Sequence, residues 1–229
     1  MYKVDCIILA AGKSTRMNMS LNKQFLEINN KPIIYYSLHK FLNHKYVNDV
    51  ILVLNNEYEE YCLKNVIKRF FLDRKIKIVL GGELRQDSVF NALKSVTSDY
   101  VLIHDGARPF VSVDCITNGI RNAYKYDASS CYVVPKDTIK IDKGNCVDVL
   151  DRERLLCVQT PQCFKTSVLI YAYDYVKKNN KIITDETSAL DLVGKKTYFY
   201  LGDYFNIKIT TKEDLYFGNV ILSNNLGEI

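Results

Sequence analysis

A short apolar run near the amino end of the chain ends in three small residues and then opens into a turn with two cations. Ala10, Ala11 and Gly12 have almost no side chain, so backbone N–H groups there can contact a polyphosphate directly. Arg16 and Lys23 can neutralise the negative charge that develops as a phosphate bond breaks. This combination of residues predicts a nucleotide-binding site.

Two commoner nucleotide motifs are excluded at this turn. A Walker loop needs a glycine five positions before its Gly-Lys pair, where this chain has Ile7. The dinucleotide fingerprint needs three glycines in the pattern Gly-x-Gly-x-x-Gly, and only Gly12 is present. An ordinary strand-to-loop turn with solvated basic residues remains the alternative for this segment taken alone.

Two later segments have the same character. Residues 81–89 begin with paired glycines, which let the backbone approach a flat base, and include Ser88 near an expected helix N-terminus. A turn before a capped helix explains that segment equally well. Asp105 follows a predicted strand, where a carboxylate can coordinate Mg²⁺ or hydrogen-bond a sugar, although aspartates in turns are also common for structural reasons.

Further polar clusters could serve a second substrate. Any one of these clusters could simply be a group of solvated surface residues, but that reading explains the whole set poorly. They are Thr138 and Asp151-Arg152, Thr160-Pro161-Gln162 in a predicted turn, Thr184 to Ser188 at a predicted helix start, and Lys208 between two β-branched residues.

Short strand-like runs alternate with helical ones through the first two-thirds of the chain. The expected strands are 4–9, 50–54, 76–80, 100–103 and 131–134, and the expected helices are 33–42, 57–71, 88–95 and 115–126. This alternation predicts an α/β fold of Rossmann-like character, with a mainly parallel sheet flanked by helices. Ligands bind beyond the carboxyl ends of such strands, where residues 10–23, 81–88 and 104–108 fall.

Residues 136–157 interrupt this alternation. Two alternating stretches with a turn between them predict a β-hairpin that projects from the body as an arm. An isolated hairpin is marginal in water, so we expect the arm to pack on a second subunit. Helices at 167–177, 186–193 and from 212, and strands at 196–200 and 205–209, complete a single domain spanning 1–229.

Composition is that of an ordinary soluble globular protein, with 48% hydrophobic and 25% charged residues and a formal charge of +5. No Lys/Arg-rich block or apolar run of membrane-spanning length occurs, so we expect neither a nucleic-acid nor a membrane partner. Seven cysteines without a Cys-x-x-Cys pair, and an amino end without a signal-peptide layout, predict a reduced, cytoplasmic protein.

Together these segments closely resemble the 2-C-methyl-D-erythritol 4-phosphate cytidylyltransferase family of the non-mevalonate isoprenoid pathway. The resemblance runs from residue 7 to about 215. The matching stretches are LAAGKSTRM with NKQF, GGELRQDSV, IHDGARPF, PKDTIK, LDRERLLCVQTPQ, TDETSAL and NIKITTKEDL.

The resemblance implies that CTP and the erythritol phosphate react in the presence of Mg²⁺ and release pyrophosphate. It assigns CTP binding to Ala10, Ala11, Gly12, Ser14, Gly82, Glu83, Ser88, Asp105 and Gly106. It assigns transition-state stabilisation to Arg16, Lys23, Arg152 and Lys208, acceptor binding to Arg108, Thr138, Thr160 and Thr184, and the metal to Asp105. Thr138 and Arg152 would reach the site of a partner subunit in a homodimer, and Glu83 stands where the family often has Asp.

The chemistry needs cations rather than a general base. The attacking group is a phosphate monoester dianion, which is already a nucleophile. Two like charges about 4 Å apart repel by about 4 kcal/mol at an effective dielectric constant of 20, so several cations and a magnesium ion are expected.

Three other functions remain as alternatives. Ribitol-5-phosphate cytidylyltransferases share the fold and chemistry, but they tend to have Gly-Gly in the first loop and Ser-Val at the position of Gly106-Ala107. A non-catalytic nucleotide sensor would not need the cations that neutralise a transition state. A nucleic-acid-binding module is disfavoured because the sequence has no basic stripe.

Overall fold

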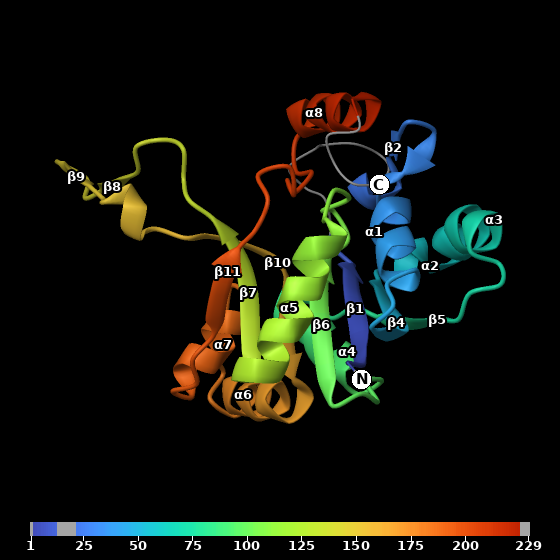
Figure 1. Cartoon of the computed structure of the whole chain (residues 1–229), viewed down its shortest axis with the longest axis horizontal. Helices are drawn as coiled ribbons and strands as arrows, with labels where there is room; N and C mark the ends of the chain where they lie inside the picture. Colours follow the sequence, from blue (N-terminus) through green and yellow to red (C-terminus); the bar gives the residue numbers. More distant parts are fainter. Residues whose placement is uncertain (1, 13–21, 225–229) are drawn as a thin grey trace.

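The computed structural model describes residues 2–12 and 22–224, and its centre is a seven-stranded sheet in the order β11-β7-β10-β6-β1-β4-β5 (Figure 1). The strands of this sheet are β1 (Val4–Ala10), β4 (Val47–Leu54), β5 (Ile76–Leu80), β6 (Tyr100–Asp105), β7 (Ala128–Val133), β10 (Cys157–Lys165) and β11 (Tyr198–Leu201). The α-helices are α1 (Ile33–Leu42), α2 (Glu59–Cys62), α3 (Lys68–Phe70), α4 (Arg85–Leu93), α5 (Val113–Tyr126), α6 (Thr166–Lys178), α7 (Glu186–Leu192) and α8 (Lys212–Ser223). Short helical turns are η2 (Lys23–Phe25), η3 (Asn56–Tyr58), η4 (Leu63–Ile67) and η5 (Arg152–Arg154), and short strands form the hairpins β2 (Glu27–Ile28) with β3 (Lys31–Pro32) and β8 (Lys140–Asp142) with β9 (Val147–Val149).

Most strand pairs in the central sheet are parallel. β1 pairs in parallel with β4 and β6, β4 with β5, and β7 with β11, whereas β10 runs antiparallel between β6 and β7. The predicted mainly parallel α/β sheet is therefore confirmed. The carboxyl ends of β6, β1, β4 and β5 meet at one edge, so the loops that follow them share one space.

Helices cover both faces of the sheet, because side chains along each strand alternate between the faces. Cys6 and Ile8 of β1 pack with α1 and α5 in one cluster, and Ile7 and Leu9 pack with α4, α6 and α7 in another. All four of these side chains are buried. This alternation on a doubly covered strand explains why β1 reads as a continuous apolar run.

The predicted arm is present as a two-stranded antiparallel hairpin, β8 and β9, that projects away from the body (Figure 1). Its strands are exposed along their whole length. The turn between them is closed by a hydrogen bond from Lys143 N to Cys146 O, and Gly144 in this turn has a φ of 86°.

Two local predictions are wrong. Residues 160–162 do not form a turn but lie within β10, at a shift of register between β10 and β7. Residues 205–209 do not form a strand: this segment runs across the sheet edge, and Ile209 N bonds to Ala107 O without a ladder forming. Buried tertiary contacts, which local sequence pattern does not report, determine both conformations.

Several boundaries also shift. α4 begins at Arg85, three residues before the prediction, and β6 continues through Asp105. Asp105 therefore belongs to the strand itself, and its position is fixed by the sheet ladder rather than by a loop.

Candidate active site

A cleft of about 460 Å³ lies at the carboxyl edge of the sheet, where the loops after four neighbouring strands meet. Its walls combine glycines, cations and a carboxylate, which suits a ligand with a flat ring and several phosphates. The lining residues are Leu9, Ala11, Gly12, Lys23, Gln24, Asn55, Asn56, Leu80, Gly81, Gly82, Glu83, Leu84, Arg85, Ser88, Asp105, Ala107, Lys208 and Thr210.

One wall of the cleft is the loop between β5 and α4. Ser88 Oγ accepts a hydrogen bond from Gly82 N at 3.1 Å and donates to Leu84 O at 3.3 Å, so this side chain ties the loop to the helix. A Cβ on Gly81 would lie 2.5 Å from Ala11 Cβ, and a Cβ on Gly82 would lie 2.3 Å from Asp87 Cβ. Only glycine allows this close approach, which leaves backbone at the surface of the wall.

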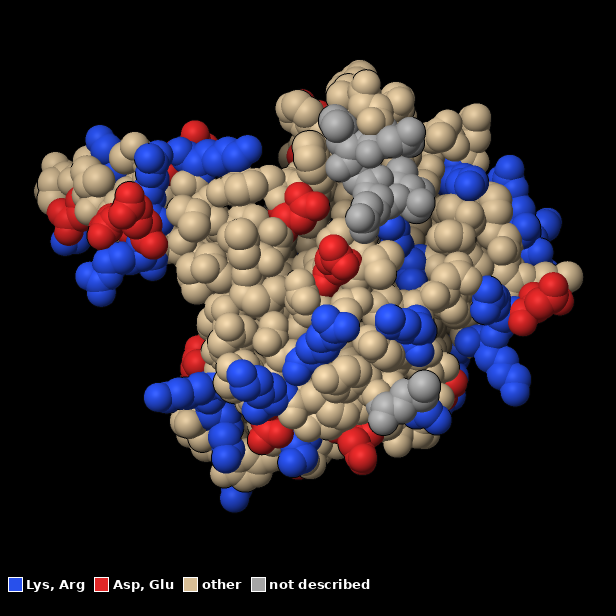
Figure 2. Space-filling view, viewed as in Figure 1, with Lys and Arg blue, Asp and Glu red and all other residues tan. Residues whose placement is uncertain are grey.

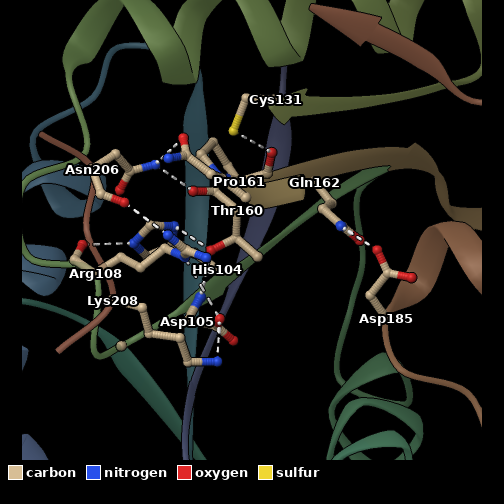
Figure 3. Close-up of polar contacts among 12 residues, drawn as sticks. His104, Asp105, Arg108, Cys131, Thr160, Pro161, Gln162, Asp185, Asn206 and Lys208 are labelled. Carbon is tan, nitrogen blue, oxygen red and sulfur yellow. Dashed lines mark hydrogen bonds and ion pairs between the residues drawn. The ribbon is translucent and has the colours of Figure 1, made fainter. Parts of the chain in front are cut away.

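Another wall is built around Asp105, which faces three cations. Figure 3 shows two of them, Arg108 and Lys208. Its Oδ2 is 2.7 Å from Lys208 Nζ and 3.7 Å from Arg108 Nε, and its Oδ1 is 3.6 Å from Arg85 Nη2. Burial alone would raise the pKa of Asp105, but the three cations outweigh it and hold that pKa well below its ordinary value. Asp105 is therefore ionised throughout the physiological pH range.

Arg85 is held from behind by a buried carboxylate. Glu186, at the start of α7, is 0% exposed and accepts hydrogen bonds from Arg85 Nη1 at 2.6 Å and Nη2 at 3.0 Å. Tyr173 of α6 donates its hydroxyl to Glu186 Oε1 at 3.0 Å. The cluster thus holds two carboxylates, Asp105 and Glu186, and three cations, those of Arg85, Arg108 and Lys208. Its net charge is +1, and Lys23 of the same cleft is not included in this sum.

A hydrogen-bond chain behind the wall fixes the backbone at Asp105. Asp105 N donates to Thr160 Oγ1 at 3.0 Å, and this hydroxyl lies 3.2 Å from His104 Nδ1. His104 Nε2 lies 3.0 Å from Arg108 O, a carbonyl that can only accept, so Nε2 carries the proton. Burial lowers the pKa of His104 to about 4, which keeps the ring neutral in this tautomer.

Arg108 is oriented by the segment that crosses the sheet edge. Its Nη1 donates to Asn206 O at 2.7 Å, and Asn206 Nδ2 donates to Thr160 O at 2.9 Å. Asn206 is 0% exposed. The same segment continues to Lys208, so one stretch of chain brings two cations to Asp105.

Several predicted site residues line the cleft: Ala11, Gly12, Lys23, Gly82, Glu83, Ser88, Asp105 and Lys208. Ala10 and Gly106 are packed behind its walls, where Ala10 belongs to the buried core and Gly106 O accepts from Ser37 Oγ at 3.2 Å. Ser14 and Arg16 lie outside the described residues. Their roles stay predictions.

Five other predicted residues do not line the cleft of their own chain, and Arg108, which lies behind Asp105, is one of them. Thr138 and Arg152 lie on the exposed arm, where Arg152 donates to Lys136 O at 2.9 Å. Thr184 is exposed, and its hydroxyl is 3.0 Å from that of Ser188. Thr160 is buried with its hydroxyl engaged by Asp105 and His104, so an acceptor contact from it stays a prediction.

Sequence reasoning missed two residues at this site, Arg85 and Glu186. Arg85 stands inside the glycine-containing segment, and its residue type alone could have marked it as a phosphate ligand. Glu186 lies in the 184–188 segment that the sequence singled out, but its pairing with Arg85, 101 residues away, left no local signal.

A metal ion would have one protein carboxylate available at the cluster, that of Asp105. Among the described residues, no three His, Cys, Asp or Glu side chains gather as a preformed metal site. Magnesium commonly binds through one or two carboxylates together with substrate phosphates and water. The donor set thus fits an ion that arrives with a polyphosphate, and it does not fit a permanently bound one.

Charge elsewhere on the surface is mixed. Figure 2 shows lysines and arginines scattered over one face of the body with acidic residues among them, and both signs on the arm. Within residues 2–12 and 22–224, no helix has the length and apolar character needed to cross a membrane.

Comparison with known proteins extends over almost the whole chain. The family model for 2-C-methyl-D-erythritol 4-phosphate cytidylyltransferase matches residues 4–224. A relative with that name from Clostridium botulinum is 50% identical over 226 residues, which are 97% of this chain and 98% of the relative, and one from Clostridium novyi is 46% identical over 227 residues, 98% of each chain. The solved structure of 4-diphosphocytidyl-2C-methyl-D-erythritol synthase from Anaerococcus prevotii has a TM-score of 0.86 at 29% identity, covering 97% of this chain and 96% of that one. The Francisella tularensis 2-C-methyl-D-erythritol 4-phosphate cytidylyltransferase has a TM-score of 0.81 at 30% identity, covering 95% and 99%.

Proposed function

This chain belongs to the 2-C-methyl-D-erythritol 4-phosphate cytidylyltransferase family, and we propose that its cleft transfers the cytidylyl group of CTP to 2-C-methyl-D-erythritol 4-phosphate. A phosphate oxygen of the acceptor attacks the α-phosphorus, the bond to the β-phosphate breaks, and pyrophosphate leaves. The product is 4-diphosphocytidyl-2-C-methyl-D-erythritol, an intermediate of the non-mevalonate isoprenoid pathway. The observation that carries this proposal is the cation cluster around Asp105, which lies across one cleft from a glycine-lined wall.

In this proposal the two walls divide the substrates between them. Exposed backbone at Gly81 and Gly82 takes the cytosine ring, with Glu83 and Ser88 at its edge. Lys23 and Arg16 take the triphosphate, and Lys208 and Arg108 take the acceptor phosphate. The reacting groups are both anionic, so the positive cluster lowers the repulsion that otherwise keeps them apart.

Magnesium is part of the proposal as a companion of CTP. Asp105 would provide the carboxylate of the protein, and phosphate oxygens and water would provide the other ligands. Bound in this way, the ion would neutralise negative charge on the phosphates.

A homodimer is the proposed functional unit. The arm exposes apolar side chains that a partner could cover: Ile141 is 45% exposed, Val147 53% and Val149 65%. Arg152 and Thr138 are carried on this arm, so a second subunit could receive them in its cleft. All seven cysteines are free thiols, which supports the proposed cytoplasmic location.

The test is to incubate purified protein with CTP, Mg²⁺ and one polyol phosphate at a time, and to measure pyrophosphate. Release is expected with 2-C-methyl-D-erythritol 4-phosphate and should be at least about tenfold slower with ribitol 5-phosphate. Faster release with ribitol 5-phosphate would assign the chain to the other acceptor. Stabilisation by CTP without any pyrophosphate would instead identify a nucleotide sensor.

A further inference from the structure

The Gln24 side chain lines the cleft, and its amide oxygen is buried without a hydrogen-bond partner within residues 2–12 and 22–224. Gln24 is 4% exposed, follows Lys23 directly in η2 and lines the cleft. Its Oε1 is buried and accepts no hydrogen bond from the described residues. Native proteins leave few such atoms unpaired, because an unsatisfied buried acceptor destabilises the fold. The oxygen therefore requires an explanation other than stability.

The main chain around this amide is firmly held. Gln24 N donates to Asn22 Oδ1 at 3.2 Å, and Asn22 Nδ2 donates to Gly12 O at 2.7 Å, which ties η2 to the end of β1. Oε1 lies 3.3 Å from the position that a Cβ on Gly106 would occupy. The amide thus lies beside the residue that follows Asp105, next to the cation cluster.

The unpaired atom is an acceptor, and this limits what it can bind. Phosphate oxygens and the cytosine carbonyl are acceptors too, so they cannot satisfy it. The proposed function places the cytosine ring, and its amino group with it, at the glycine wall. Among the groups of the two substrates, the remaining donors are hydroxyls of the ribose and of the polyol. In this conformation Oε1 is buried. The terminal torsion of glutamine is soft, so a half-turn of the amide exchanges Oε1 and Nε2 and would present Oε1 to a bound substrate.

We propose that Gln24 contacts the substrate and accepts a hydrogen bond from a sugar hydroxyl, of either the ribose or the polyol. A site built to pair with a hydroxyl rejects an analogue that lacks it, because its own polar group is then left unpaired. Gln24 would therefore set substrate specificity, whereas the neighbouring Lys23 would neutralise the negative charge of the triphosphate. This inference rests on the proposed function and adds a residue to it.

The test combines Gln24→Met with substrates that lack one hydroxyl at a time. Met keeps the length of the side chain and removes the amide. Initial rates are measured with CTP, 2′-deoxy-CTP and 3′-deoxy-CTP, and with methylerythritol phosphate and its 1-, 2- and 3-deoxy analogues. For one analogue, the wild type should lose about tenfold in kcat/KM relative to the parent substrate, and Gln24→Met should treat analogue and parent alike. The analogue that shows this loss identifies the hydroxyl as belonging to ribose or to polyol.

Gln86→Met is the matched control, because the amide of Gln86 lies outside the cleft and both its nitrogen and its oxygen are hydrogen-bonded. Its Nε2 donates to Lys181 O at 3.0 Å, and its Oε1 accepts from Ile183 N at 3.0 Å. Gln86→Met should lower the melting temperature by about 2 °C or more and leave the discrimination between analogues unchanged. Gln24→Met should not lower it, since the substitution removes an acceptor that was already unpaired.

A second variant guards against a folding defect. Gln24→Glu keeps an acceptor oxygen at this position and should retain the discrimination at a lower kcat, because its charge opposes the triphosphate. Unchanged kcat/KM ratios for every analogue in Gln24→Met, or no discrimination by the wild type, would overturn the inference. A wild type that releases no pyrophosphate from CTP would overturn the proposed function as well, so the two failures are distinguishable.

Discussion

At the scale of single residues, Lys23 is a cation held in a fixed position in the cleft. It is 8% exposed and lies in η2, a turn that the hydrogen bonds of Asn22 hold against Gly12. A charge in such a site is poorly screened by water and needs little rearrangement when phosphates bind.

Replacing Lys23 by Ala should therefore lower kcat by about a hundredfold or more, by analogy with the loss of one preorganised charge-stabilising group. The rate of pyrophosphate release at saturating CTP measures this effect. Lys75→Ala is the control, because Lys75 is exposed before the amino end of β5, away from the cleft. Near-normal turnover of Lys23→Ala would remove this residue from the catalytic set.

His104 makes stability depend on pH in a defined direction. Burial lowers its pKa to about 4 from an ordinary value of 6.5, so the unfolded chain binds a proton more readily than the folded one. The stability that the neutral His104 ring gives the folded state is fully present above pH 6.5 and is lost as the pH falls toward 4. His104→Gln should flatten this dependence, as measured by urea denaturation at pH 7, 5.5 and 4.5. The same decline in the variant and the wild type would show that other groups cause it.

At the scale of elements, α4, α6 and α7 meet at one buried ion pair. α4 carries Arg85, α7 carries Glu186, and α6 contributes the hydroxyl of Tyr173. The two charges differ in burial: the Arg85 side chain is 31% exposed and that of Glu186 is 0% exposed. Losing the partner therefore destabilises the fold more when the buried Glu186 is left alone than when the partly exposed Arg85 is.

Arg85→Met should destabilise the fold by about 3 kcal/mol or more, because it leaves a buried carboxylate without its cation. Glu186→Gln should cost less, since Arg85 can still reach water and Asp105. Guanidinium denaturation of both variants measures the difference. A larger loss in Glu186→Gln than in Arg85→Met would contradict this account of the pair.

At the scale of the whole molecule, the proposed dimer gives the arm a role in completing the site. Arg152 lies in η5, shortly after the exposed hairpin of β8 and β9. This hairpin projects away from the body (Figure 1). In a two-fold dimer, each arm would place its Arg152 in the cleft of the other subunit, so both sites would depend on one interface.

This arrangement predicts complementation between two inactive variants. In a mixture of Lys23→Ala and Arg152→Ala subunits, each mixed dimer has one site that combines an intact Lys23 with an intact Arg152. After unfolding and refolding together, an equal mixture should recover about a quarter of wild-type activity. No recovery would mean that Arg152 acts within its own chain or not at all. Sedimentation equilibrium on the mixture checks that dimers have formed.

Local sequence pattern was sufficient for most elements and for the loops that line the cleft. Short apolar runs predicted β1 and β5, and helical spacing of apolar residues predicted α1, almost to the residue, because buried strands and one-sided helices each leave a recognisable apolar pattern. The small residues before Gly12 and the pair at Gly81 likewise marked where backbone comes to the surface. The arm was predicted from its alternation and turn.

Only the tertiary structure decided how the cation cluster is assembled. The sequence by itself determined an α/β fold, and it predicted a nucleotide-binding edge with Lys208 and Asp105 among its residues. It did not show that Arg85 is paired with Glu186, that Thr160 lies in a strand behind Asp105, or that Gln24 is left with an unpaired oxygen. These facts depend on contacts between segments up to about a hundred residues apart, and neither periodicity nor local motif encodes such contacts.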